Sequence, residues 1–299
     1  MIDSHIHLTH RKFDNVFPYL QTDPGFSILT ETGNRTKVIA ALKEAGVSFV
    51  VEPAIDLKSN EKILALARKE NGFVLPAVGV HPTRTYAYQA VRRTAEGVEK
   101  AVVRLLWADR KKIASYAKDP QVAAIGETGL DYHLKRDQQH RFRQTIWFLW
   151  QLELAHRHRL PVILHVREAD RDAIRILRLF RRRIHGGVCH CFRGGPDLAN
   201  AYTALGLMLG IGGSLLTNHA GELEEAIRQT PLEHLLLETD GPYVKPTCPE
   251  LTQKQRYAAR NTSLILPGVI RRIAELKGVP YEAVEQITDE NAKRLFRKR

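Results

Sequence analysis

The sequence predicts a (β/α)8 barrel, also called a TIM barrel, that takes residues 1–299 as a single domain. Apolar, β-branched runs alternate with longer helix-like stretches, which is typical of a parallel sheet built from βα units. Eight such runs occur, the number of strands in a TIM barrel, and 299 residues is a usual length for one. No linker rich in Pro, Gly or Ser divides the chain, and no internal repeat is visible.

The predicted strands are short runs spread along the whole chain. They are Met1–Leu8, Val47–Pro53, Phe73–Val80, Val122–Glu127, Pro161–Val166, Gly187–Phe192, Leu207–Gly212 and Leu235–Asp240.

Helical periodicity appears between these runs. Thr36–Ala45 is expected to be a helix that stops at Gly46, and Pro280–Leu295 a final helix that closes the barrel. The helix predicted over Asp137–His158 carries an apolar stripe interpreted as core, and the helix over Asp170–Arg183 a row of arginines interpreted as a solvated face. The stripe is Phe142, Ile146, Leu149, Trp150, Leu152 and Leu154, and the row is Arg171, Arg175, Arg178 and Arg182.

Two stretches show no such order. His10–Thr36 is expected to be an enlarged loop after the first strand, at the end of the barrel where active sites lie, and therefore to shape substrate access. Pro82–Asp119 is helix-rich, with boundaries that the pattern does not define.

Composition restricts the class of protein. Apolar residues make up 43%, enough for a large core, and three cysteines are too few for a disulfide framework. With no apolar run of membrane-spanning length and no N-terminal signal pattern, we expect a cytoplasmic protein without a membrane partner. The net charge of +12 favours an anionic partner such as nucleic acid, although excess Lys and Arg can simply solvate a surface. Nothing in the sequence indicates a protein partner.

Metal-binding residue types recur at the carboxyl ends of the predicted strands. His5 and His7 lie two residues apart on one face of the first strand, a spacing that can hold a divalent cation. In barrel enzymes the reacting groups lie at this end of the strands, so seven such residues on six strands predict one site. They are His5, His7, His81, Glu127, His165, His190 and Asp240.

The mixture of donors favours two cations over one. Four histidines and two acids are more than one ion needs, whereas two ions that share a carboxylate would use them all. Glu127 lies on a strand between the two histidine groups and is the natural bridge. Two divalent cations in such a site activate water for hydrolysis, and Mg, Mn and Zn are the candidates.

With these residues in place, the chain resembles the TatD-type metal-dependent hydrolases, a deoxyribonuclease branch of the amidohydrolase-like barrels. The likeness spans almost the whole chain, and the Gly-Glu-x-Gly-Leu-Asp-Tyr and Glu-Thr-Asp-x-Pro-Tyr blocks are its most specific parts. The segments that carry it are Asp3–Leu8, Val80–Pro82, Ala124–Tyr132, Pro161–Ala169, His190–Phe192, Leu237–Tyr243, Arg260–Asn261 and Asn291–Phe296.

The resemblance implies a role for each residue. His5, His7 and Asp240 would hold the first metal, His165 and His190 the second, and Glu127 would bridge them. Asp240 and Glu127 would be catalytic, with Asp240 orienting or deprotonating the attacking water. His81 would contact a substrate phosphate, unless it is an ordinary core histidine. Arg167, two residues after His165, is a candidate phosphate clamp because its forked donors match phosphate oxygens.

The chain also departs from the family pattern. Arg193 stands where a serine is usual and Ser263 where a proline is usual. These changes leave the proposed ligands intact and bear on substrate choice.

Three functions remain open at this stage. The first is a phosphodiesterase acting on DNA, such as a 3'-5' exonuclease. The second is an amidohydrolase-like enzyme acting on a small amide, lactone or ester. The third is a nucleic-acid-binding barrel with a vestigial site.

Overall fold

A computed structural model describes residues 1–22, 27–85, 109–133 and 137–297. Eight strands form one sheet, in which each strand lies beside the next in chain order and all pairs are parallel. The strands are β1 (Ile2–Asp3), β4 (Phe49–Pro53), β5 (Val74–Val78), β6 (Ala124–Asp131), β7 (Val162–Arg167), β8 (Gly187–Cys189), β9 (Met208–Ile211) and β10 (Leu235–Leu237).

The sheet closes between its first and last strands. The Ser4 amide donates to the Leu237 carbonyl at 2.9 Å, and the Asp240 amide donates to the His5 carbonyl at 2.8 Å. A parallel bridge joins Ile6 to Gly241 beyond the ends of β1 and β10. These contacts bring the two ends of the sheet together, and the predicted TIM barrel is confirmed.

Each strand differs from its predicted range at one end or both, and two of these differences bear on the site. The first run, Met1–Leu8, is a regular strand only over Ile2–Asp3, because the chain then turns toward β10 and keeps single contacts with it. The fourth run does not end at Glu127 but continues to Asp131, and its pairing with β7 shifts register between Ile125 and Thr128. Glu127 therefore lies within a strand, at an irregularity that brings a carboxylate to the inside.

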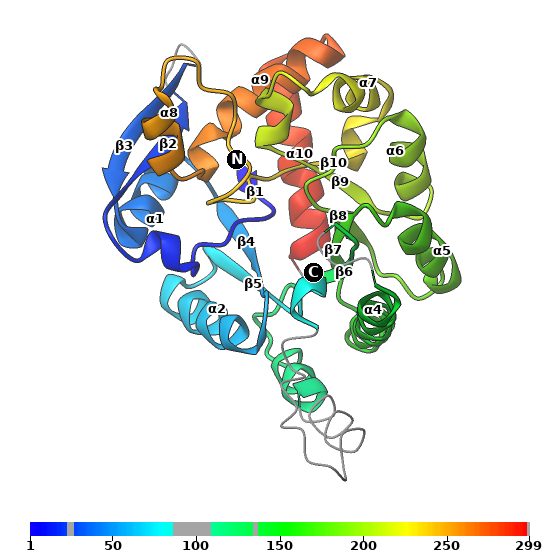
Figure 1. Ribbon diagram of the computed structural model, residues 1–299. Coiled ribbons are helices and arrows are strands. Elements are labelled where there is room, and N and C mark those ends of the chain that lie inside the picture. The colour runs from blue at the N-terminus through cyan, green and yellow to red at the C-terminus, as the bar shows by residue number, and fades with distance from the viewer. Residues whose placement is uncertain (23–26, 86–108, 134–136, 298–299) are drawn as a thin grey trace.

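Helices surround the barrel (Figure 1). They are α1 (Arg35–Glu44), α2 (Leu57–Glu70), α4 (Gln138–His158), α5 (Asp170–Phe180), α6 (Pro196–Thr203), α7 (Gly221–Gln229), α8 (Gln253–Ala258), α9 (Leu266–Lys277) and α10 (Tyr281–Phe296).

Local chemistry sets several helix limits. The Asp56 side chain accepts the Ser59 amide and the Ser59 hydroxyl accepts the Asp56 amide, a capping box that starts α2. Asp137 caps α4 by accepting the His140 amide. Gly278, in the left-handed conformation at φ +63°, ends α9.

The end of the barrel opposite the candidate site is closed by α10. Ala292 and Phe296 of this helix pack with the side chains that fill the barrel interior, including Ile2, Phe49 and Leu236. The Asn291 side chain donates to the Leu232 and Leu235 carbonyls at 2.8 and 2.9 Å, which fixes the helix to the start of β10. The predicted closing role of this helix is confirmed.

The segment predicted as a loop, His10–Thr36, is a different structure. It contains a hairpin of β2 (Phe17–Thr22) and β3 (Ile28–Gly33), paired antiparallel in a second sheet. Phe17 and Tyr19 are buried against Phe13 and Val38, and the Leu20 amide donates to the Arg260 carbonyl. The sequence hides this hairpin because neither strand alternates in burial: Tyr19 and the adjacent Leu20 of β2 are both buried, and β3 is exposed along most of its length.

Two smaller predictions on helices need correction, and a third is confirmed. Phe142, assigned to the core stripe of α4, is 65% exposed, whereas Trp147 and Phe148 are buried, because the inward face is rotated from the predicted one. The predicted helix Asp170–Arg183 ends at Phe180. The four arginines of its row are exposed, as predicted.

Most of the helix-rich stretch Pro82–Asp119 lies outside the described residues. Within them, Pro82–Arg84 forms a short 3-10 turn and residues 109–116 are helical. Among all described residues, no helix combines the length and the apolar character that crossing a bilayer requires.

The anchoring of α10 can be tested with Asn291→Ala. Loss of the amide leaves two buried carbonyls without a donor, so we expect the free energy of unfolding to fall by about 2–4 kcal/mol. Urea unfolding measures this change. Asn200→Ala, on the exposed face of α6, is the matched control and should change stability by less than about 0.5 kcal/mol. Equal effects of the two substitutions would contradict the proposed anchor.

Candidate metal centre

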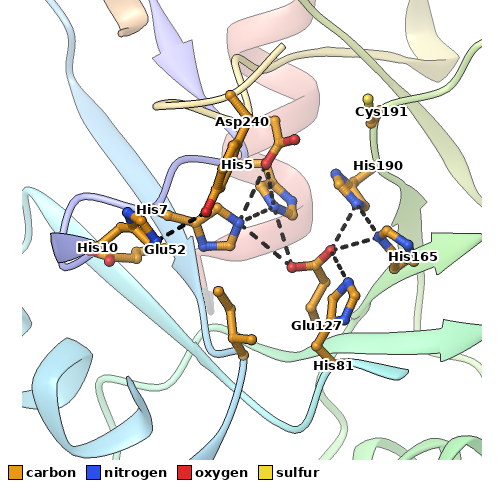
Figure 2. A network of polar contacts seen from close by, with 12 residues as sticks. His5, His7, His10, Glu52, His81, Glu127, His165, His190, Cys191 and Asp240 are labelled. Carbon is orange, nitrogen blue, oxygen red and sulfur yellow. Dashed lines mark hydrogen bonds and ion pairs between the residues drawn. The ribbon is translucent and has the colours of Figure 1, made fainter. Parts of the chain in front are cut away.

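Side chains from six strands meet at the carboxyl-end rim of the barrel (Figure 2). They come from the middle of β6, from β7, and from the segments after β1, β5, β8 and β10. Residues up to 235 positions apart are thereby brought into contact, as the 3.7 Å distance between His5 Nε2 and Asp240 Oδ1 shows. The converging residues are His5, His7, His81, Glu127, His165, His190 and Asp240.

Glu127 lies at the centre of the cluster and turns one oxygen to each side. Its Oε2 is 3.7 Å from His5 Nε2 and 3.6 Å from His7 Nε2. Its Oε1 is 2.9 Å from His190 Nε2 and 3.0 Å from His165 Nδ1. One carboxylate therefore contacts both histidine pairs, which is the arrangement a bridging ligand requires.

The spacing of the nitrogens fits shared cations. Two nitrogens that bind one tetrahedral zinc lie roughly 3.3 Å apart, because each is about 2.0–2.1 Å from the ion. Nε2 of His5 is 3.2 Å from Nε2 of His7, and Nδ1 of His165 is 3.1 Å from Nε2 of His190. Asp240 Oδ1 lies 3.4 Å from His7 Nε2 and adds an oxygen donor on the first side.

Three groups of residues in the described part of the chain have donor atoms close enough together to hold a cation. The first is His5, His7 and Glu127, the second His81, Glu127 and His165, and the third His5, His190 and Asp240. The groups overlap, and the His5 and His190 rings stack at 3.9 Å between centroids. Donors from both predicted metal sites thus form one continuous cluster.

His81 directly contacts this cluster. Its Nε2 is 3.4 Å from Glu127 Oε1, and its ring lies 4.2 Å from that of His165. Its Nδ1 meets the Thr83 hydroxyl at 2.7 Å, which holds the ring toward the site.

The electrostatic environment holds Glu127 and His5 in the forms that bind metals, whereas the charge of Glu127 raises the pKa of His190 well above its usual value despite burial. Burial alone would raise the pKa of Glu127, but the charges of His81 and His190 lower that pKa well below its usual value. Burial, followed by the charge of His190, holds the pKa of His5 well below its usual value. The result is an ionised carboxylate beside a neutral imidazole, and both are metal-binding forms.

Asp131 is a site residue that sequence reasoning did not single out. Its Oδ2 lies 3.0 Å from Nε2 of His165, on the opposite side of the ring from Glu127. A carboxylate behind a metal-binding imidazole fixes the ring and its tautomer. The sequence does contain a signal for this residue, since Asp131 follows Glu127 by four residues in the same strand and is the Asp of the Gly-Glu-x-Gly-Leu-Asp-Tyr block.

Asp3 connects the first strand to the last turn of the barrel. Its Oδ1 accepts the amides of His5 and Thr239, both at 3.1 Å. Its Oδ2 accepts the hydroxyls of Thr239 and Ser263, both at 2.6 Å. Burial raises the pKa of Asp3 to about 7. The network orders the chain on both sides of the His5–Asp240 contact.

Ser263 helps to hold the Asp3 network in place. The residue that departs from the family pattern donates a hydrogen bond to Asp3, which a proline could not make.

Two further buried acids lie behind the histidines. The Glu52 Oε1 accepts the Thr9 amide at 2.6 Å, and burial raises the pKa of Glu52 to about 7. The Glu238 Oε1 accepts the Cys191 amide at 2.5 Å and lies 3.7 Å from His190 Nδ1. Gly210 makes room for Glu238, because a Cβ there would come within 2.0 Å of the carboxylate.

Two clefts open beside the cluster, and Tyr243 lines both. One, of about 570 Å³, includes His7; the other, of about 550 Å³, includes His165, His190 and Asp240. Arg167 and Arg193 line the second cleft, so Arg167 lies at the mouth of the site with its side chain exposed.

Comparison with known proteins identifies the class of protein that this barrel and its histidine–carboxylate rim represent. The family model described as TatD related DNase matches residues 2–297. The chain belongs to the TatD family of metal-dependent hydrolases, with an amidohydrolase-like barrel.

Individual relatives cover nearly the whole chain. The Bacillus subtilis protein called "Uncharacterized metal-dependent hydrolase YabD" is 30% identical over 99% of both chains. The "3'-5' ssDNA/RNA exonuclease TatD" of Yersinia pseudotuberculosis is 33% identical over 87% of this chain and 92% of its own.

Solved structures show the same barrel. The crystal structure of YjjV, a TatD homolog from Escherichia coli K12, superposes with a TM-score of 0.76 at 26% identity and covers 100% of this chain and 98% of its own. An amidohydrolase from Saccharomyces cerevisiae shares the fold at a TM-score of 0.75 and 18% identity, covering 99% of each chain.

The Asp3 network makes a graded prediction for stability. Asp3→Ala removes the acceptor of four buried donors and should lower the free energy of unfolding by about 3–5 kcal/mol. Ser263→Ala removes one hydrogen bond and should cost about 0.5–1.5 kcal/mol. Urea unfolding in chelator, which removes any contribution from bound metal, measures both. A Ser263→Ala loss as large as that of Asp3→Ala would contradict the network.

Proposed function

We propose that this TatD family hydrolase cleaves phosphodiester bonds in DNA, releasing nucleotides from a 3' end, and that it uses two divalent cations. The observation that carries the proposal is the position of Glu127, whose two oxygens face separate histidine pairs. The Yersinia relative, an exonuclease acting on single-stranded DNA and RNA by its name, supports the substrate class. The net charge of +12 is consistent with a polyanionic substrate.

We assign the ligands from these contacts. His5, His7 and Asp240 would hold one cation, His165 and His190 the other, and Glu127 would contact both. When bound, the divalent cations would polarise a phosphoryl oxygen and lower the pKa of a water, so that near neutral pH the deprotonated water could attack phosphorus and displace the ester oxygen of the neighbouring nucleotide. Mg, Mn and Zn suit this donor set.

The remaining steps belong to side chains. Asp240 is the acid of the cluster with part of its side chain open to the cleft, so it can take the proton of the attacking water. Asp131 keeps the His165 ring in place. His81 faces Glu127 from the rim, where it can donate to a phosphate oxygen, and Arg167 can clamp a phosphate from the adjoining cleft.

The reaction can be tested with Glu127→Ala and Asp240→Asn. The first removes the carboxylate common to both histidine pairs, and the second keeps an oxygen but removes the proton acceptor. We expect each to lower nucleotide release from single-stranded DNA by ~100-fold or more, and chelator to abolish it. Labelled oligonucleotides on denaturing gels measure this release. His219→Ala, an exposed histidine outside the cluster, is the control and should keep full activity.

The same preparations separate the other functions. Hydrolysis of small amides or lactones with no action on DNA would replace the proposal by an amidohydrolase. Absence of bound metal after purification in metal-replete buffer would indicate a vestigial site. Wild-type cleavage rates in the Glu127→Ala and Asp240→Asn variants would contradict the mechanism.

The role of Asp131 makes a prediction on metal affinity. In Asp131→Ala the His165 ring loses the acceptor on its far side, so we expect one of the two cations to bind 10–100-fold more weakly. Isothermal titration of the metal-free protein with zinc measures both affinities. Asp172→Ala, which removes a carboxylate bonded to the Tyr132 hydroxyl outside the cluster, is the control. Unchanged binding in Asp131→Ala would show that Asp131 does not support His165.

A further inference from the structure

We propose that the cleft beside His7 binds the sugar–phosphate backbone of the strand that remains after cleavage. This inference rests on the proposed nuclease function and extends it to a second binding region. The cleft is formed by the segment after β1, the start of α2, the turn after β5, and the segment after β10. Its lining residues belong neither to the predicted metal ligands nor to the predicted phosphate contacts, except for His7.

The charge of this cleft is the first argument. Five cationic side chains line it, against one carboxylate, Asp56. That carboxylate is engaged as the cap of α2. The five cations are exposed, and the described residues give none of them an acidic partner within ion-pair distance. They are Arg11, Lys12, Lys58, Lys62 and Arg84.

Gathering five cations at one cleft creates repulsion that a bound anion would relieve. Some exposed cations elsewhere pair with acids, as Lys37 does with Glu31 and Lys43 with Glu70. Others, such as Arg175 and Arg178, have no ion-pair partner among the described residues, so the distinguishing feature here is the clustering around one cleft. The charges around Lys12 repel one another: burial, then the charges of Arg260 and Arg11, lower the pKa of Lys12. Unpaired cations lining one cleft are the electrostatic pattern that phosphate backbones neutralise.

The second argument is the position of Tyr243. The Lys12 ammonium lies 4.3 Å from the centre of its ring, and its hydroxyl meets His10 Nε2 at 3.0 Å. Tyr243 is 36% exposed and lines both clefts. The centroids of its ring and of the His7 ring are 6.3 Å apart. An aromatic face held beside a cationic groove is a stacking surface for an unpaired base.

The third argument is the contrast between the two clefts. The cleft beside His165 has two arginines, Arg167 and Arg193, but also the acids Glu168, Asp170 and Asp240. A retained strand carries many phosphates, whereas a released nucleotide carries one. The strongly basic cleft therefore suits the retained strand, and the mixed cleft suits the released product.

Charge reversal at Lys58 and Lys62 tests the assignment. Both are exposed on α2, so Lys58→Glu/Lys62→Glu should fold, which circular dichroism can verify. The matched control is Arg175→Glu/Arg178→Glu, with the same change in net charge on exposed positions of α5, which lies on another side of the barrel (Figure 1).

Binding is measured on the metal-loaded full chain by fluorescence anisotropy. The probe is a fluorescein-labelled single-stranded 15-mer with phosphorothioate linkages that resist cleavage, and its integrity is checked on a gel. We expect the Lys58/Lys62 variant to bind about tenfold or more weakly and the control less than about twofold more weakly. The slope of log affinity against log salt should fall by roughly 1.4 for two lost phosphate contacts.

Two results would overturn the proposal. One is unchanged 15-mer binding in the Lys58/Lys62 variant, and the other is an equal loss in the control, which would mean that net charge alone attracts DNA. Failure of the proposed function looks different: the wild type would bind the 15-mer through this cleft but release no nucleotide from unmodified DNA with any of the three metals.

Discussion

The closure of the barrel between its first and last strands is the constraint on which the site depends. His5 and His7 follow β1, and Asp240 follows β10, so they meet only because these strands lie side by side. Asp3 secures that seam by accepting donors from both sides of it and from Ser263 beyond. A buried carboxylate with four donors is costly to disturb, and it holds the backbone that positions the first histidine pair.

Glu127 then determines how the two halves of the cluster relate. It comes from a strand between the histidine-bearing strands, and its register irregularity directs the carboxylate inward. Acids behind the imidazoles, Asp131 for His165 and Glu238 for His190, limit how far these rings can turn. The geometry of the centre is thus set by buried polar contacts from several strands rather than by any single motif.

Much of the fold and the location of the site could be predicted from the sequence, because strands and helices alternate regularly in this barrel. Apolar runs reveal the strands, and a polar residue at the end of such a run must lie at the rim, which placed His165 and His190 correctly in space. Whether these residues bind metal remains a prediction. The same reasoning could not find the β2–β3 hairpin, since one of its strands is exposed along most of its length and is buried only at its two ends, Ile28 and Gly33. It also could not find the role of Ser263, because a hydrogen bond across 260 residues leaves no local pattern.

The closure of one end of the barrel by α10 affects how substrate and product reach and leave the site. Among the described residues, buried side chains fill the interior, and Ala292 and Phe296 cover its far end. Substrate would therefore enter, and product would leave, at the same end of the barrel, the histidine rim. If the enzyme shortens a polymer stepwise, as proposed, the departing fragment and the advancing chain would both use this rim, and the two clefts lined by Tyr243 would let them use different parts of it.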